Sequence, residues 1–204
     1  METKLTEQQS LGIITEMIER ARTNVQKGSG TYMVYYGSIV SIIALLNIVL
    51  IYSLKNPINS FWIWCGMIPV VIFEKIWQGR KDKEVLIRTH IDHIISSVWA
   101  GFLITQVIFL ILIFGSAIYL NDYRFYFLIT PVILLSMGLA EFVTAQACRF
   151  KPFLYGAIAM WVGALACLAT LMFANPVVIQ FLILPVCMTL GFVIPGYKLN
   201  KMAK

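Results

Sequence analysis

The chain has 204 residues, of which 59% are hydrophobic and only 13% are charged. Soluble globular domains carry about 25% charged residues, and their exterior must stay polar, so this composition excludes a water-soluble domain. The formal net charge is +6, but the basic residues flank apolar segments, where they meet anionic lipid head groups. No basic stripe interleaved with aromatic residues is present, which argues against nucleic-acid binding. The composition predicts an all-α, polytopic membrane helical bundle in a lipid bilayer.

Residues 1–30 predict an amphipathic helix that lies in the cytoplasm or at the membrane interface. The stretch Thr6-Glu-Gln-Gln9 matches a capping box, and Gly28 is a suitable helix end. One face of this helix is apolar and consists of Leu11, Ile14, Ile18, Ala21 and Val25. Two interpretations stay open: the helix lies on the membrane surface, or its apolar face contacts a cytoplasmic protein partner.

Residues 31–197 predict six membrane-spanning helices, because a span needs roughly 20 mostly apolar residues. Pro152 to Tyr197 is uncharged over 46 residues, which is too long for one span. Asn175-Pro176 divides it, since proline cannot donate the helical hydrogen bond. A basic cytoplasmic tail follows at 198–204. The predicted spans are 31–54, 61–77, 94–120, 125–148, 152–174 and 177–197.

Lysine and arginine counts predict the orientation of the bundle. With the amino terminus inside, 14 of the 16 basic residues lie on the cytoplasmic side, and only Lys55 and Arg124 lie outside. No cleavable signal peptide is visible ahead of the first span. We therefore expect a multi-pass protein of the bacterial inner membrane, with both termini in the cytoplasm.

A weak internal repeat predicts three parallel hairpins of two helices each. The second helix of each hairpin carries a proline in a similar setting, at Pro69, Pro131 and Pro185. The pairs Trp99/Gly101 and Trp161/Gly163 recur at the 62-residue offset that separates Pro69 from Pro131. Such prolines are expected to kink their helices. The kinks either line a central cavity or serve helix packing alone.

Glu141 is the acidic residue placed clearly inside a predicted span. It lies eight residues before Arg149, roughly 12 Å along the helix. An ionisable group at that depth is a functional hypothesis by default and should face the bundle interior. With Asn47 and Gln106 it forms the predicted intramembrane polar site. The alternative is that Glu141 reaches the inner interface or is a neutral, hydrogen-bonded core residue.

The sequence predicts no catalytic or cofactor-binding residues and no cofactor. His90 and His93 are three residues apart and would share one helix face, so they are candidate metal ligands. A complete metal site would need further ligands, and the sequence contains neither HExxH nor Glu-x-x-His. We therefore predict no metal site, and interfacial histidines are the default interpretation.

Three stretches carry a resemblance to a known family. They are Thr6-Glu-Gln-Gln-Ser-Leu-Gly-Ile-Ile-Thr-Glu-Met-Ile18, His90-Ile-Asp-His-Ile-Ile95 and Gly191-Phe-Val-Ile-Pro-Gly-Tyr197. The chain resembles a family of uncharacterised small bacterial integral membrane proteins. Genes of that family often lie near small winged-helix transcriptional regulators, so the resemblance implies a sensory or regulatory association. It implies no active-site residues.

Three functions follow from these observations as hypotheses. The leading one is a non-enzymatic accessory, sensory or regulatory membrane protein that acts through a cytoplasmic partner. The second is a small transporter or channel with a central site around Glu141, Asn47 and Gln106. The third is a membrane enzyme with a site at the inner ends of predicted helices two to four. The sequence leaves open whether the protein forms a homo-oligomer.

Overall fold

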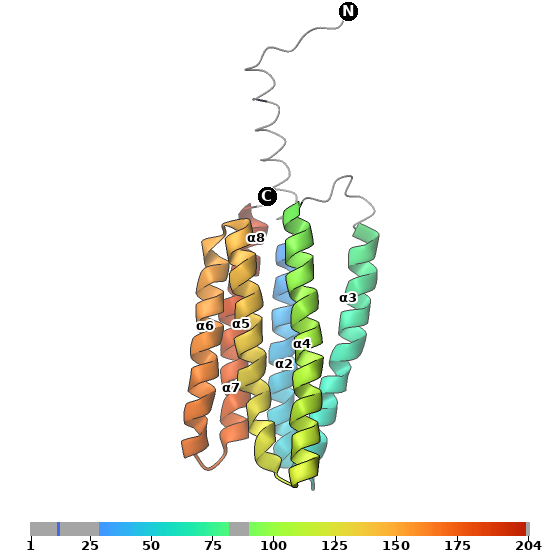
Figure 1. Cartoon of the computed structure of the whole chain (residues 1–204), viewed down its shortest axis with the longest axis vertical. Helices are drawn as coiled ribbons and strands as arrows, with labels where there is room; N and C mark the ends of the chain where they lie inside the picture. Colours follow the sequence, from blue (N-terminus) through green and yellow to red (C-terminus); the bar gives the residue numbers. More distant parts are fainter. Residues whose placement is uncertain (1–11, 13–28, 82–89, 203–204) are drawn as a thin grey trace, which may run out of the picture.

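The computed structural model describes residues 12, 29–81 and 90–202, and every element in these ranges is helical. The elements join end to end into six rods that lie side by side (Figure 1). The rods are α2 (Ser29–Ser53), η1 with α3 (Pro57–Gly66 and Met67–Lys81), α4 (His90–Leu120), η2 with α5 (Tyr123–Leu128 and Ile129–Cys148), α6 with η3 (Lys151–Ala169 and Thr170–Met172), and α7 with η4 and α8 (Pro176–Met188, Thr189–Val193 and Ile194–Met202).

Five of these helices are long and apolar enough to cross a membrane, which confirms the membrane class and the all-helical fold. They cover Gly30–Ser53, Ile91–Leu120, Arg124–Cys148, Lys151–Met172 and Pro176–Met202. The second predicted span, 61–77, corresponds to a shorter apolar helix, Ile58–Phe73. The rod itself continues to Lys81, but its last turns carry charge. The count of six crossings therefore stays a prediction.

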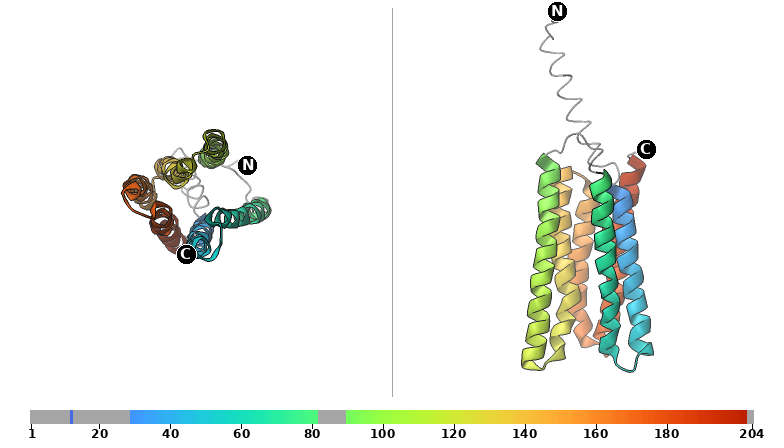
Figure 2. Two further views of the ribbon diagram at one scale, coloured as in Figure 1. Left: turned by 90° about the horizontal axis from the view of Figure 1, so that it is seen from below. Right: turned by 90° about the vertical axis from the view of Figure 1, so that its right-hand side faces the viewer.

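The rods follow one another around a ring when the bundle is viewed along its axis (Figure 2). The order is α3, α2, α7, α6, α5 and α4. Direct packing links α2 to α7, α7 to α6, α6 to α5 and α5 to α4, and α2 also packs on η1, η4 and α8. The most extensive contact joins α5 and α6, so this antiparallel hairpin is the best-packed part of the bundle.

Two of the described connections begin the next helix with a side-chain cap. Asn56 accepts a hydrogen bond from the N–H of Ile58 at the start of η1, and Asp122 does the same for Arg124 at the start of η2. Both are side-chain caps of a kind that helix starts prefer. Prolines occupy the first turns of η1, α6 and α7, where the missing N–H has no consequence. The break predicted at Asn175-Pro176 is confirmed.

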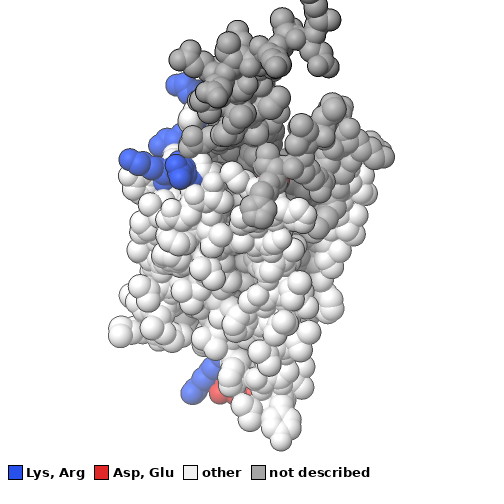
Figure 3. Space-filling model, turned by 45° about the horizontal axis from the view of Figure 1, so that its top comes forward, with Lys and Arg blue, Asp and Glu red and all other residues white. Residues whose placement is uncertain are grey.

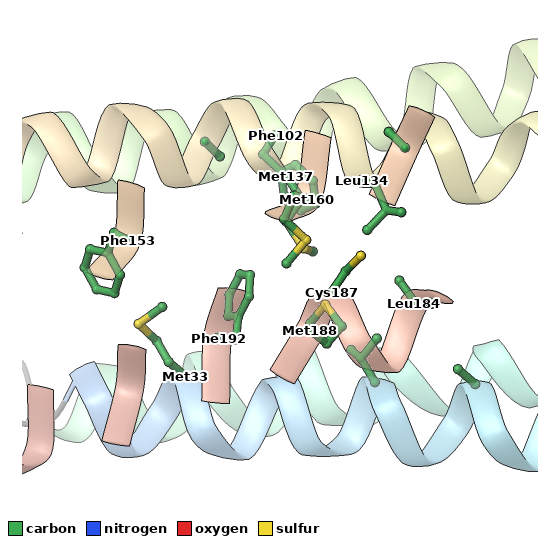
Figure 4. Packing of buried hydrophobic residues seen from close by; sticks show 14 of the residues in the cluster. Met33, Phe102, Leu134, Met137, Phe153, Met160, Leu184, Cys187, Met188 and Phe192 are labelled. Carbon is green, nitrogen blue, oxygen red and sulfur yellow. The ribbon is translucent and has the colours of Figure 1, made fainter. Parts of the chain in front are cut away.

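The buried hydrophobic core is formed by side chains from α2, α4, α5, α6, α7, η4 and α8. Figure 4 shows methionines and aromatic rings pointing into this core from the facing helices. Met160 and Met188 are fully buried, and Phe192 packs against Trp99 and Tyr36 with ring centroids 5.7 and 5.9 Å apart. Methionine side chains are flexible and polarisable, so they can fill irregular spaces in this core.

Glycines bring the beginning of α2 against the end of α8. A Cβ on Gly196 would lie 2.7 Å from the carbonyl oxygen of Gly30, and the Thr31 hydroxyl donates to Asn200 Oδ1 over 3.2 Å. Close backbone approach through small residues is the usual way that membrane helices associate. The two ends of the described chain, Ser29 and Met202, therefore lie at the same end of the bundle.

Charged side chains lie at the two ends of the bundle, and an uncharged band separates them on the face shown in Figure 3. The end that holds Ser29 and Met202 carries the described basic residues Arg149, Lys151, Lys198 and Lys201. Lys55 and Arg124 lie in the connections at the opposite end. A band of this kind is what a bilayer core requires on the outside of a bundle.

The three repeat prolines do not share one local structure. Pro69 and Pro131 are each the third residue of an α-helix that follows a 3-10 segment, which ends at Gly66 and Leu128 respectively. Pro185 instead lies inside α7. The packing of Gly101 and Gly163 also differs, because only Gly163 contacts another helix, at the Sγ of Cys187. The first two hairpins are alike at their prolines, and the threefold repeat stays a prediction.

Gly196→Ala should lower the stability of the bundle by about 1–3 kcal/mol, because the new methyl group meets the Gly30 backbone, which cannot move aside locally. The matched control is Gly101→Ala, at a helical glycine with no heavy atom within 4 Å of the added Cβ. Thermal unfolding of the purified proteins in detergent would measure both. Equal melting temperatures for the two variants would contradict the close packing of α2 on α8.

Candidate functional site

The buried face of α5 carries one acidic residue among apolar ones. Leu134, Met137, Glu141 and Ala145 recur at three- and four-residue spacing and are all buried. Glu141 is 1% exposed, and carboxylates are almost never that deeply buried without a partner. The side chain thus occupies a position where packing alone would favour a hydrophobic residue.

The Glu141 carboxyl fits against two glycines of neighbouring rods. Its Oε1 occupies the space that a side chain of Gly156, on α6, would need. Its Oε2 lies 3.1 Å from where a Cβ of Gly191, in η4, would be placed. Gly156 and Gly191 also touch each other, since a Cβ on Gly156 would lie 2.8 Å from the Gly191 Cα. We call this arrangement of Glu141, Gly156 and Gly191 the carboxyl niche.

Neither Glu141 oxygen has a hydrogen-bond partner among the described residues. Of the polar residues that follow Glu141 on α5, Thr144 donates its hydroxyl to the Ala140 carbonyl over 2.8 Å, and Gln146 is exposed. An isolated buried charge costs several kcal/mol even after relaxation. In this structure the carboxyl therefore needs a proton or a bound cation to balance it.

The third member of the niche lies in a π-helical turn. The N–H of Ile194 bonds to the carbonyl of Thr189, five residues back, and η4 interrupts the rod between α7 and α8. Pro195 accounts for this turn physically, because a proline ring clashes with the carbonyl four residues earlier, here that of Gly191. Widening of the helix relieves that clash. Single π-turns inside α-helices are frequent at functional sites.

The predicted polar site does not form one cluster. Asn47 is fully buried and pairs with Ser60 through two hydrogen bonds of 3.2 Å, one to its carbonyl and one from its hydroxyl. Gln106 donates to the Ser136 hydroxyl. Neither shares a described hydrogen-bond partner with Glu141, so the structure brings together Glu141 and two glycines instead of Glu141, Asn47 and Gln106.

A further buried polar group lies between α6 and α7. Gln180 donates to the Thr170 hydroxyl and to the Cys167 carbonyl, over 3.3 and 3.4 Å. This pair, and the partners Ser60 and Ser136, were missed from the sequence, because uncharged polar residues in apolar runs are common and their partners lie on other helices. Each pair is satisfied internally, as polar groups between membrane helices require.

The remaining candidates are described only in part. His93 is exposed on α4, and nothing is described of the His90 side chain. Among residues 12, 29–81 and 90–202 there is no cluster of three or more potential metal ligands of the types His, Cys, Asp and Glu. The predicted partner-contact face, from Leu11 to Val25, lies outside the described residues, so that prediction stays open.

No protein-family model, no curated protein and no solved structure matches the chain. Function must therefore be argued from the carboxyl niche itself.

Gly156→Ala should destabilise the protein by about 1–3 kcal/mol, because the methyl group competes with the Glu141 carboxyl and the Gly191 backbone for the same space. In a Glu141→Ala background the loss should shrink by at least about 0.5 kcal/mol, the coupling expected of two groups in contact. A double-mutant cycle by thermal unfolding measures this. The control is Gly115→Ala, where the added Cβ meets nothing within 4 Å; additive losses at positions 141 and 156 would refute the niche.

Proposed function

We propose that the protein crosses the inner membrane six times with both termini in the cytoplasm. Five crossings are the long apolar helices. The sixth would be the rod formed by η1 and α3, which is helical from Pro57 to Lys81 and runs alongside the others in Figure 1. The described basic residues support this orientation, with four at the end that holds Ser29 and Met202 and two at the other.

A reporter fused after Lys204 should be active only in the cytoplasm, and one fused within the Lys55–Asn59 connection only outside. Cytoplasmic activity would be read with a fluorescent protein and external activity with alkaline phosphatase. A fusion after Lys81 should again report the cytoplasm if η1 and α3 cross the membrane. An external signal at Lys81 would leave five crossings or fewer and would contradict the six-span topology.

We propose that the protein is a small proton-coupled transporter in which Glu141 is the proton-binding group. The observation that carries this proposal is the buried Glu141 carboxyl without a hydrogen-bond partner among the described residues. Intramembrane acids that face a bundle interior are the usual proton-binding groups of pumps and transporters. Here protonation changes the charge of the niche, and no described partner neutralises the carboxylate otherwise.

The surroundings of Glu141 support a change of helix packing on protonation. The carboxyl lies against the backbone of Gly156 in α6 and of Gly191 in η4, so a charged carboxylate that gains water would push these two rods apart. The π-turn is a natural hinge, since it already interrupts the helix at this level. Transporters alternate between two packings of rigid helices around a central site. In this proposal, protonation of Glu141 is the switch and the π-turn that contains Gly191 is the hinge.

Glu141→Gln should remove the pH response of the protein while the fold is kept, because glutamine is neutral and has nearly the same shape. Ionisation of a carboxyl buried without a partner costs free energy in the folded protein but not in the unfolded chain, so the stability of the wild type should fall as the pH rises, by at most about 1.4 kcal/mol for each pH unit. Lowering the pH again restores it. Thermal unfolding at a series of pH values measures this. The control is Asp122→Asn, which removes an acid from the connection that begins η2, beside Arg124.

Charge displacement after a pH jump would test the transport step directly. Proteoliposomes that contain the wild type would be adsorbed to a solid-supported membrane. A pH jump should then give a transient current, because each proton that reaches Glu141 moves charge part of the way across the bilayer. Glu141→Gln should abolish this current. A wild-type protein without such a current, or a Gln variant that keeps it, would overturn the proposal.

The two other functions have no specific support from the described residues. Regulation through a cytoplasmic partner depends on the apolar face between Leu11 and Val25, and the enzyme hypothesis depends in part on His90, whose side chain is not described. Both stay predictions from the sequence.

A further inference from the structure

Four exposed basic side chains lie at the end of the bundle that holds Ser29 and Met202. They are Arg149, Lys151, Lys198 and Lys201, and we call them the basic patch. Figure 3 shows the basic side chains of this end gathered at one edge of the molecule. Within the described part of the chain, none of the four is paired with an acid.

The carboxyl niche shows that the members of the basic patch lie at similar heights in the bundle. Glu141, Gly156 and Gly191 meet at one level. Counted from these three residues, the basic residues lie eight positions along α5, five along α6, and seven and ten along the rod of η4 and α8. At 1.5 Å per residue they lie roughly 12, 8, 10 and 15 Å from that level, a spread of less than about two helical turns. Since α6 also packs on α8, the patch extends over adjacent rods.

The acids whose side chains the structure describes do not neutralise the basic patch. Asp122 lies in the connection at the opposite end, with a carboxyl oxygen 4.0 Å from Arg124. Glu141 is buried at the niche. Asp92 lies at the same end of the bundle as the patch, but it belongs to α4, which packs on α5. Charge complementarity therefore favours an anionic partner at the patch.

The backbone of Arg149 supplies a second, independent observation. Its φ of 50° and ψ of 41° are the left-handed conformation in which helices usually end with glycine. The N–H of Phe150 bonds to the Ala145 carbonyl over 3.1 Å, as in helix ends of that kind. The other non-glycine residue with positive φ in the described ranges is Asn121, whose short polar side chain tolerates it. Packing of this turn thus does not explain a long, charged side chain at position 149.

Toward the middle of the bundle, the exposed surface beside the basic patch changes from charge to apolar side chains. On α6, Lys151 is followed at helical spacing by Tyr155 and Ile158, which are both exposed. On the neighbouring rod, the exposed Ile194 lies one turn before Lys198. Basic residues, then an aromatic ring, then aliphatic side chains are the order that matches the head group, interface and acyl chains of a phospholipid.

We propose that the basic patch binds the phosphate of one anionic phospholipid, whose acyl chains lie along the apolar surface of α6 and of the rod of η4 and α8. Lysine and arginine at a membrane surface attract anionic head groups, and a guanidinium such as that of Arg149 holds a phosphate through two parallel N–H bonds. A lipid is favoured over a free anion because apolar side chains adjoin the charge. This inference goes beyond the proposed function and does not depend on Glu141.

Thermal unfolding of the purified full-length protein in a non-ionic detergent, titrated with phosphatidylglycerol, tests the proposal. The melting temperature should rise by about 5–10 °C at a lipid concentration a hundredfold above the Kd, because a ligand that binds only the folded state stabilises it. Phosphatidylcholine with the same acyl chains has no net charge, and inorganic phosphate has no acyl chain, so both should have little effect. An equal response to phosphatidylcholine would leave no role for the charge, and an equal response to inorganic phosphate would indicate a free anion. Either result would overturn the proposal.

Arg149→Gly is the sharpest variant, because glycine adopts the left-handed conformation more readily than arginine. Without lipid this variant should melt no lower than the wild type, yet its Kd for phosphatidylglycerol should rise about fivefold, as expected for the loss of one basic group at the membrane surface. Lys198→Gln, within the regular helix α8, should raise the Kd by a similar factor. The control is Lys55→Gln, a change of an exposed basic residue in the connection at the opposite end, which should keep the wild-type Kd. Wild-type affinity in both patch variants would place the lipid elsewhere and refute the inference.

Discussion

The burial of one carboxyl against two glycines is the constraint on which the bundle depends. Glu141 occupies a core position of α5, and its bulk is accommodated only because Gly156 and Gly191 have no side chains. The same glycines let α6 and η4 approach each other closely, so the acid lies where these two rods meet. A protein that needed only a packed core would be more stable with a hydrophobic residue here. Packing alone therefore does not explain an acid at this position.

Elsewhere the bundle is held by satisfied polar pairs and small residues. Asn47 with Ser60, and Gln180 with Thr170, bond to each other at the ends of their helices away from Ser29, and Thr31 bonds to Asn200 at the opposite end. Because each of these pairs is complete, it stabilises one arrangement of its helices. The carboxyl niche differs, since its acceptors lack donors among the described residues. The described polar pairs near the two ends of the bundle are thus hydrogen-bonded, whereas the Glu141 carboxyl between them has no hydrogen-bond partner among the described residues.

Composition and apolar runs were enough to predict an all-helical membrane protein with long apolar helices, five of which the structure contains. They failed where the result depends on contacts between helices. The sequence could not show that Asn47 pairs with Ser60 rather than Glu141, because an apolar run does not indicate which face of its helix packs on which neighbouring helix. The three prolines looked equivalent in the sequence, yet two follow 3-10 segments and Pro185 lies within an α-helix. The π-turn depends on how the ring of Pro195 is accommodated, which periodicity does not encode.

The position of Pro195 connects local backbone chemistry with the behaviour of the whole bundle. A proline in a membrane helix deprives a carbonyl one turn earlier of its donor, and in hydrocarbon that carbonyl must find another partner. Here the affected turn is the one that packs against Glu141, so the missing N–H and the buried acid lie at the same level of the bundle. Protonation turns the Glu141 carboxyl from an acceptor alone into a group that also donates. The proposed transport cycle uses this one change at the level where α5 packs against α6 and η4.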